Sequence, residues 1–220
     1  MTRTELIAEF RERAFDKSEP HLWSDDWLFV TLRAAEDEAC IRGRLIHDSD
    51  TDEVCRVTIS ENASRYALHP ALYEITHSSV SYQGSRTPIR LVSTEWLDCN
   101  VPDWRTESGR PEYAVQQQGS VRLVPSPADD GELILEGFRL PLEYAADDAD
   151  ASPEFPATHH RKLVEWLLYM AYSIPDTERL DPGKSQRAYA DFQLYFGPRP
   201  DADLRASTRH DAPQHNVGYY

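Results

Sequence analysis

The clearest hydrophobic pattern in the chain predicts two consecutive helices within residues 154–197. We expect the first helix to begin after Pro156 and to end near Ile174. Between residues 163 and 171 almost every position is apolar, so this helix has hardly any polar face to turn toward water. A helix that is apolar all round must be enclosed, either by its own domain or by neighbouring subunits.

The second helix of this pair has recognisable signals at both ends. Asp181 is expected as its N-cap, with Pro182 at the first helical position. Gly197, which is followed by a proline, is expected to end it. The two helices together predict a C-terminal helical hairpin over residues 156–197, and an extended C-terminal arm follows over residues 198–220.

The N-terminal quarter of the chain also has a helical pattern. We expect Thr4 to cap a short helix that ends near Asp16. Ser24 is expected to cap a longer helix, whose first turn carries two aspartates that suit the positive end of the helix dipole. The apolar stripe of this longer helix continues to Ile46 and includes small residues, which permit close packing.

Between residues 53 and 142 the hydrophobic period changes to two, which is typical of β-strands. Proline and glycine turns separate short alternating runs. The runs are residues 57–59, 66–68, 73–75, 89–91, 121–123 and 133–135. This spacing predicts a small antiparallel sandwich or barrel, with one short helical interruption at residues 94–98.

The predicted fold class is therefore α+β, a helical body with an inserted β-module. The helical body combines the N-terminal helices in residues 1–52 with the hairpin in residues 156–197, and residues 53–142 form the β-module. An acidic linker at residues 143–155 leads back from the module to the body. It holds five acidic side chains and no basic one, which predicts a solvated segment. The C-terminal arm, residues 198–220, follows the hairpin.

The charge of the chain excludes several classes of function. The 220 residues carry a net charge of -15 at pH 7. A stable grip on nucleic acid needs clustered Lys and Arg, but an acidic wall still lets DNA pass.

No apolar run approaches the roughly 18 residues of a membrane span, and the charged N-terminus does not resemble a secretory signal. Three cysteines without metal-binding spacing favour synthesis in a reducing cytosol.

The sequence contains no catalytic signature, so we expect a protein that is not an enzyme and that needs no cofactor. Nucleophile-elbow, phosphate-loop and dinucleotide-binding patterns are all missing from it. His159 and His160 are adjacent, and successive side chains on a helix diverge by about 100°, so no metal site is expected there. Five scattered tryptophans leave an alternative function open, a β-sandwich module that binds carbohydrate or protein. An enzyme with an unfamiliar site is the other class left open.

Several stretches, in this order, resemble the head–tail adaptor (connector) proteins of tailed bacteriophages. The first group is residues 22–26 (LWSDD), 34–40 (AAEDEAC) and 42–46 (RGRLI), and the second is residues 66–70 (YALHP) and 109–113 (GRPEY). The third group is residues 153–156 (PEFP), 159–166 (HHRKLVEW), 171–172 (AY) and 192–197 (FQLYFG). Together they span most of residues 20–197, and their order within a helix–β–helix layout carries the resemblance.

The resemblance implies a virion structural protein made in the bacterial cytoplasm and placed at the head–tail interface. Such adaptors form a ring, expected to be dodecameric, beneath the portal protein of the capsid. The ring hands DNA on toward the tail without reading its sequence. The implied partners are the portal protein, further copies of the chain, and the next tail component, which is a nozzle or tail-completion protein.

The resemblance also implies that the C-terminal arm reaches the portal, although a polar, proline-containing terminus is more commonly disordered. Aromatic side chains at the end of the arm are suited to anchor it, and its arginines can pair with acidic groups. The expected docking residues are Arg205, Arg209, Val217, Gly218, Tyr219 and Tyr220. Trp166, Tyr169 and Tyr172 on the all-apolar helix are expected subunit contacts, because aromatic residues concentrate in interface cores.

Overall fold

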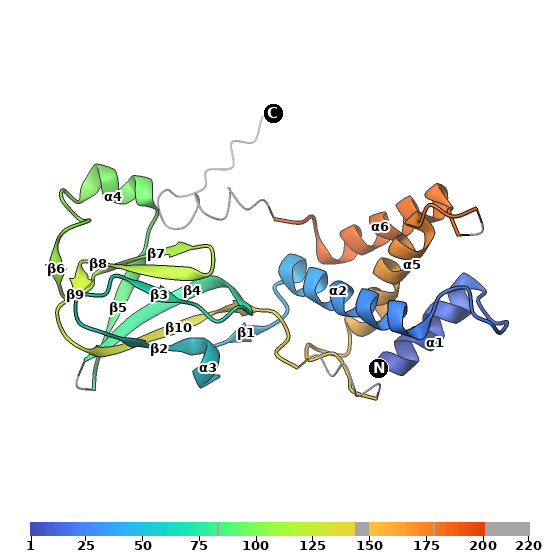
Figure 1. Ribbon diagram of the computed structural model, residues 1–220, viewed down its shortest axis with the longest axis horizontal. Helices are drawn as coiled ribbons and strands as arrows, with labels where there is room; N and C mark the ends of the chain where they lie inside the picture. Colours follow the sequence, from blue (N-terminus) through green and yellow to red (C-terminus); the bar gives the residue numbers. More distant parts are fainter. Residues whose placement is uncertain (83, 144–149, 178, 201–220) are drawn as a thin grey trace, which may run out of the picture. The chain divides into compact units, whose positions relative to one another are not determined.

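The computed structural model has an α+β fold and describes residues 1–82, 84–143, 150–177 and 179–200 (Figure 1). The chain divides into two compact units. The first unit contains Met1–Ile46 and Leu140–Arg199, and the second contains His47–Arg139. Residues from both sides of His47–Arg139 therefore form the first unit, and this segment is an insertion into it.

The first unit is built from α-helices. They are α1 (Arg3–Ala14), α2 (Asp25–Gly43), α5 (Leu163–Ser173) and α6 (Pro182–Phe196), with the 3₁₀ helix η1 (His160–Lys162) before α5. One hydrophobic core takes side chains from all four α-helices. The largely apolar helix α5 lies at the centre of this core, because α1, α2 and α6 all pack against it. Its enclosure is thus provided largely within its own unit.

Capping at the helix ends agrees with the sequence in two cases and differs in one. The side chains of Ser24 and Asp181 cap α2 and α6 as expected. Thr4 is not the cap of α1, which begins earlier because Thr2 forms a capping box with Glu5. In that box the Thr2 side chain accepts from the Glu5 backbone and the Glu5 carboxylate accepts from the Thr2 backbone.

Three helices are shorter than the sequence predicts: α1 and α2 end earlier, and α5 begins later. The helix α1 ends at Ala14 instead of near Asp16, because Phe15 has a left-handed backbone (φ 59°). Likewise α2 ends at Gly43 and does not reach Ile46, because Arg44 is left-handed. The chain after Pro156 forms turns and then η1 before α5 begins.

The second unit is built mainly from β-strands. They are β1 (His47–Asp48), β2 (Arg56–Ile59), β3 (Arg65–Ala67), β4 (Leu72–Tyr82), β5 (Ser85–Leu91), β6 (Ser108–Gly109), β7 (Tyr113–Gln117), β8 (Ser120–Val124), β9 (Ser126–Pro127) and β10 (Gly131–Arg139). Two short helices, α3 (Asp52–Cys55) and α4 (Thr94–Asn100), interrupt them. The helix α4 confirms the expected interruption at residues 94–98.

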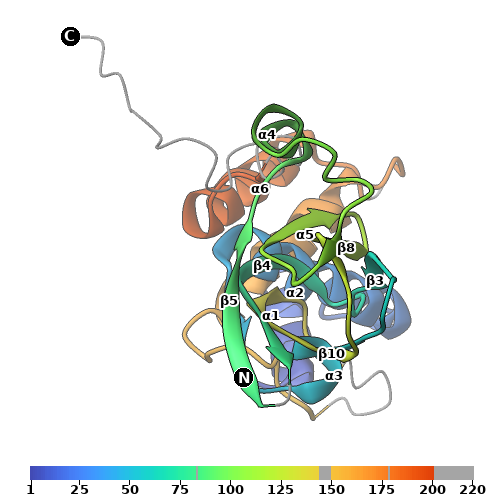
Figure 2. The same ribbon diagram turned by 90° about the vertical axis from the view of Figure 1, so that its left-hand side faces the viewer.

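The main sheet of this unit curls (Figure 2). Its strand order is β1-β10-β4-β5-β7-β8-β3, and β2 also pairs with β10. The strand β5 pairs with β4 along Ser85–Ile89 and then with β7 through Arg90 and Leu91. Because one strand serves both neighbours in succession, the two halves of the sheet are continuous. A small cluster of buried residues includes Leu97 of α4, Val115 of β7 and Val124 of β8.

Each of the six predicted runs overlaps a strand, but four strands were missed. Three of them, β1, β6 and β9, have only two residues each. The fourth, β7, reads YAVQQ and has two consecutive buried residues, so it lacks the alternation used to find strands. The main sheet is mostly antiparallel as expected, although β5 pairs in parallel with β7. The strands β6 and β9 pair in parallel in a separate two-stranded sheet.

The two points where the chain enters and leaves the second unit are joined by a buried ion pair. The entering strand β1 pairs with the end of β10, so that His47 lies opposite Phe138. Asp48 and Arg139, each 6% exposed, lie next to this pairing. The Nε atom of Arg139 donates a hydrogen bond to Asp48 Oδ2. The pair therefore fastens the first strand of the unit to its last.

The second oxygen of this carboxylate holds the turn that follows β1. Asp48 Oδ1 accepts from the backbone N–H groups of Asp50 and Thr51, each at 3.0 Å. Burial opposes ionisation of Asp48, but the hydrogen bonds from Thr51 and Arg139 outweigh it and hold the pKa of this carboxyl well below its usual range. Burial and the charge of Asp48 raise the pKa of the Cys55 thiol to about 12, so Cys55 stays protonated.

Replacing Asp48 by asparagine (Asp48→Asn) should destabilise the second unit by about 3–5 kcal/mol, because the buried guanidinium of Arg139 would lose the negative charge of Asp48. The matched control is Asp52→Asn, which breaks the exposed ion pair with Arg56 and should cost less than about 1 kcal/mol. Urea unfolding of the second unit measures both. Equal losses in the two variants would contradict the role assigned to Asp48.

The lowered pKa of Asp48 also fixes the sign of a pH effect. Its stabilising contribution should be complete above the pKa of an unfolded aspartate, near about pH 4, and should be lost as the pH falls below that value. Acid titration of unfolding should therefore show a steeper loss of stability in the wild-type protein than in Asp48→Asn. Parallel acid profiles would count against this assignment.

Candidate functional site

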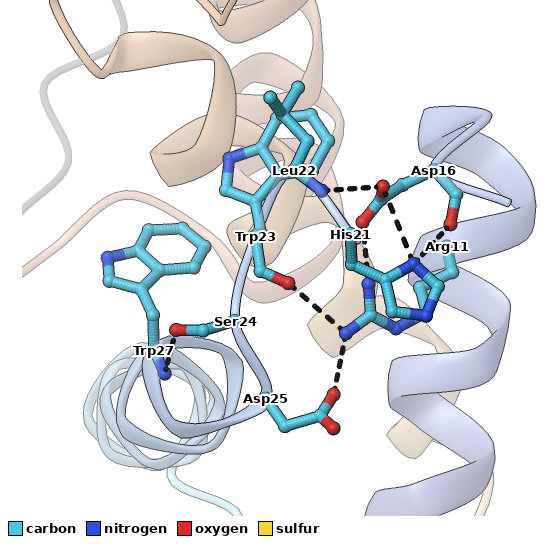
Figure 3. Close-up of polar contacts among 8 residues, drawn as sticks. All are labelled: Arg11, Asp16, His21, Leu22, Trp23, Ser24, Asp25 and Trp27. Carbon is cyan, nitrogen blue, oxygen red and sulfur yellow. Dashed lines mark hydrogen bonds and ion pairs between the residues drawn. The ribbon is translucent and has the colours of Figure 1, made fainter. Parts of the chain in front are cut away.

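The junction between α1 and α2 contains the first stretch that resembles the adaptor family, and one arginine organises it (Figure 3). Arg11 donates through Nη1 to Asp16 Oδ2 at 2.5 Å. Through Nη2 it donates to the Trp23 carbonyl at 3.2 Å and to Asp25 Oδ1 at 2.6 Å. Asp16 in turn accepts from the backbone N–H of Leu22 at 2.8 Å. These bonds tie the end of α1, the connecting loop and the start of α2 together.

A cleft of about 410 Å³ lies beside this junction. Its lining comes from the loop after α1 and from Arg179, so it brings two distant parts of the first unit together. Phe15 lies at this cleft and is 83% exposed. Trp23 forms the buried side, where its ring packs edge-on against Phe10 and Tyr172 at centroid distances of 5.4 and 6.0 Å. A fixed wall with an exposed aromatic ring beside it is suited to a protein contact.

Removing the carboxylate of Asp16 (Asp16→Ala) should loosen the junction and cost about 1–3 kcal/mol, because a buried acceptor for Arg11 and Leu22 would be lost. The control Glu12→Ala removes the exposed partner of Lys17 and should cost less than about 1 kcal/mol. Hydrogen exchange at the Leu22 amide should become faster only in Asp16→Ala. Unchanged exchange in that variant would refute the anchoring role.

The aromatic residues expected at a subunit interface lie on α5. Tyr172 is 8% exposed and packs on Trp23, so little of its surface is left for a second subunit. Trp166 and Tyr169 are half-buried. They contact each other at a centroid distance of 5.2 Å, and both contact Tyr189 of α6. Their free edges are the part of this cluster that a neighbour could reach.

The place where the C-terminal arm begins is held by a buried arginine. Arg42 lies over the rings of Trp166, Tyr189 and Phe192 at 5.3–5.6 Å and forms an ion pair with Glu38 at 2.7 Å. It also donates to the Gly197 carbonyl at 3.4 Å. Arg199 lies 3.8 Å from the same Glu38 carboxylate. The root of the arm is therefore fixed to α2.

The expected docking residues themselves lie outside the described residues. These are Arg205, Arg209, Val217, Gly218, Tyr219 and Tyr220. The acidic linker is described only in part, because residues 144–149 are also outside. Sequence reasoning missed Arg42 as the anchor of the arm, although its spacing of four residues from Glu38 on one helix was a visible signal.

The second unit has its own shallow cleft, of about 500 Å³, near another stretch that resembles the adaptor family. Arg110 lies 5.8 Å from the centroid of the Tyr82 ring and donates to Thr87 Oγ1. Burial raises the pKa of Tyr82, and the nearby Asp129 adds to this effect.

The tryptophans offer no open row for sugar stacking among the described residues, since Trp104 is 5% exposed and Trp96 has a guanidinium over its ring.

The two adjacent histidines serve as hydrogen-bonding residues of the first unit. His160 is buried, and its Nε2 lies 2.8 Å from the Phe155 carbonyl. His159 Nδ1 lies 3.1 Å from the Tyr195 hydroxyl. Within the described ranges, no group of three His, Cys, Asp or Glu side chains is placed to hold a metal ion. The described helices also include none with the length and hydropathy that crossing a membrane requires.

A family model described as SU10 adaptor protein matches residues 1–215. The chain therefore belongs to the SU10 adaptor family, which confirms the expected class of phage adaptor proteins and makes it a virion component. A search of curated proteins found none that matches the sequence.

Proposed function

We propose that this adaptor forms a ring beneath the portal, joins the capsid to the tail and lines part of the DNA channel. The observation that carries the proposal is the family match over residues 1–215. The net charge of -15 supports it, because an acidic channel wall repels DNA and lets it slide. The adaptor acts by assembly and not by chemistry.

In this proposal the C-terminal arm docks on the portal. The anchored root at Gly197 and Arg199 supports this, because a fixed starting point limits the volume that the arm must search. Tyr219 and Tyr220 would supply aromatic anchors, Val217 and Gly218 would lie against the portal, and Arg205 and Arg209 would pair with acidic groups. Ordering of the arm on docking costs entropy, which keeps a single subunit weakly bound.

Ring formation then follows from the symmetry of the portal. Each docked arm raises the local concentration of the next subunit, and head-to-tail contacts close a ring, here a dodecamer, when the rotation suits it. The half-buried edges of Trp166 and Tyr169 are the proposed subunit contacts, and Tyr172 supports them from the core. The β-strand unit would face the next tail component, a nozzle or tail-completion protein.

The arm is tested by truncation after Pro200, which leaves the anchored root intact. Sedimentation of the adaptor with the portal encoded beside it should show a ring for the full chain and no stable complex for the truncated one. The first unit should keep its stability, since its described core ends before the cut. Equal portal binding by both proteins would overturn the docking role of the arm.

A second comparison separates docking from ring closure. Replacing Tyr219 and Tyr220 by serine should weaken binding to the portal without changing the subunit contacts. Replacing Tyr169 by alanine should leave docking intact and reduce closure of the ring, which mass measurement of the complex detects. If neither the full chain nor any variant associates with the portal at any salt concentration, the proposed function itself is wrong.

A further inference from the structure

The second unit carries an arginine cluster formed by Arg65, Arg105 and Arg122. Arg65 on β3 lies directly opposite Arg122 on β8 in the antiparallel register. Like charges in this position repel, and such cross-strand pairs usually combine opposite charges or apolar side chains. The strand β3 ends the strand order of the sheet, so this pair lies at a sheet edge.

A buried tryptophan holds the other side of the cluster in place. The guanidinium groups of Arg105 and Arg122 lie 4.3 and 4.5 Å from the centroid of the Trp104 ring. Arg122 Nη2 also donates to the Arg105 carbonyl at 3.4 Å. The Trp104 Nε1–H donates to Asp98 at 2.9 Å, which fixes the ring under both arginines. The positive groups are thus positioned and do not extend freely into solvent.

The positive charge of the cluster is poorly neutralised. Asp98 accepts two hydrogen bonds from Arg105, at 2.6 and 3.2 Å. Neither Arg65 nor Arg122 is in an ion pair with a carboxylate of the described residues, and Nε of Arg122 is buried without a partner there. Burial and the charges of Arg65 and Arg105 lower the pKa of Arg122. An incoming anion would relieve the repulsion between these like charges.

We propose that the arginine cluster binds an acidic segment of a partner protein, one with neighbouring carboxylates. The planar guanidinium fork matches a carboxylate with two parallel hydrogen bonds, and Arg65 offers such a fork beside the Nη1–Nη2 end of Arg122. The stacking on Trp104 reduces the entropy lost when the Arg122 fork is engaged. This inference concerns the second unit alone and does not depend on portal binding.

An acidic protein fits better than nucleic acid. A grip on DNA needs many phosphate contacts over a broad basic surface, and its affinity falls steeply with salt. Here Arg65 and Arg122 are the two arginines of the cluster without an ion pair among the described residues. The whole chain has 38 acidic and 23 basic side chains, and this negative balance repels a long polyanion. A short acidic segment can use the local charge while keeping most of its length away from that repulsion.

Binding is tested with a fluorescein-labelled hexaglutamate peptide and the full-length protein, followed by fluorescence anisotropy. Arg65→Gln and Arg122→Gln should each weaken binding by about tenfold or more, as expected for a charge-assisted hydrogen bond. Arg122→Lys keeps the charge but loses the fork, so its loss should be intermediate. Arg187→Gln, an exposed arginine of α6, is the matched control and should bind like the wild type.

Three results would overturn the proposal. They are no binding of the peptide to the wild-type protein, equal losses in Arg187→Gln, and tighter cluster-dependent binding of a thymidine 12-mer, which would assign the surface to nucleic acid.

Thermal unfolding distinguishes a binding role from a purely structural one. Because Arg65 faces Arg122, Arg65→Gln should raise the unfolding temperature of the unliganded protein while weakening peptide binding. A lower unfolding temperature with unchanged peptide binding would show that the cluster only covers Trp104, and would also refute the proposal.

Discussion

The ion pair between Asp48 and Arg139 is the interaction on which the second unit depends. It joins residues 91 positions apart in the sequence and closes the unit where the chain enters and leaves it. Burying both charges is costly, so a pair of this kind contributes more to defining one register than to net stability. The same carboxylate also orders the turn after β1 and, after burial, is the next largest cause of the raised pKa of the Cys55 thiol.

The first unit depends on contacts between the two ends of the sequence. The central helix α5 is covered by α1 and α2 from the N-terminal part and by α6 from the C-terminal part. The ion pair Arg13–Glu165 joins α1 of the N-terminal part to α5 of the C-terminal part. The buried ion pair Arg3–Glu36 joins α1 to α2 within the N-terminal part. Burial raises the pKa of Glu36 even though Arg3 opposes this. Because helices from both ends of the sequence share one core, we expect the first unit to fold cooperatively.

Local signals in the sequence predicted the helices well, because a cap depends on a few neighbouring residues. Ser24 and Asp181 show this. The cap of α1 is predictable in the same way, because Glu5 lies three residues after Thr2 and completes a capping box with it, and the prediction of Thr4 was wrong. The strand β7 lacks alternation, since its Ala114 and Val115 are both buried. The partners Asp48 and Arg139, and the arginines around Trp104, meet only through the sheet register, which no local pattern encodes.

The pairing of β1 with β10 has a consequence for how such proteins diversify. Because His47 and Phe138 are opposed residues of adjacent strands, the two junctions with the first unit start about 5 Å apart. A short turn could span that gap, so the whole insertion resembles a cassette with adjacent ends. Phage lineages could then exchange, enlarge or delete the cassette in a single recombination event while the helical scaffold keeps its own core.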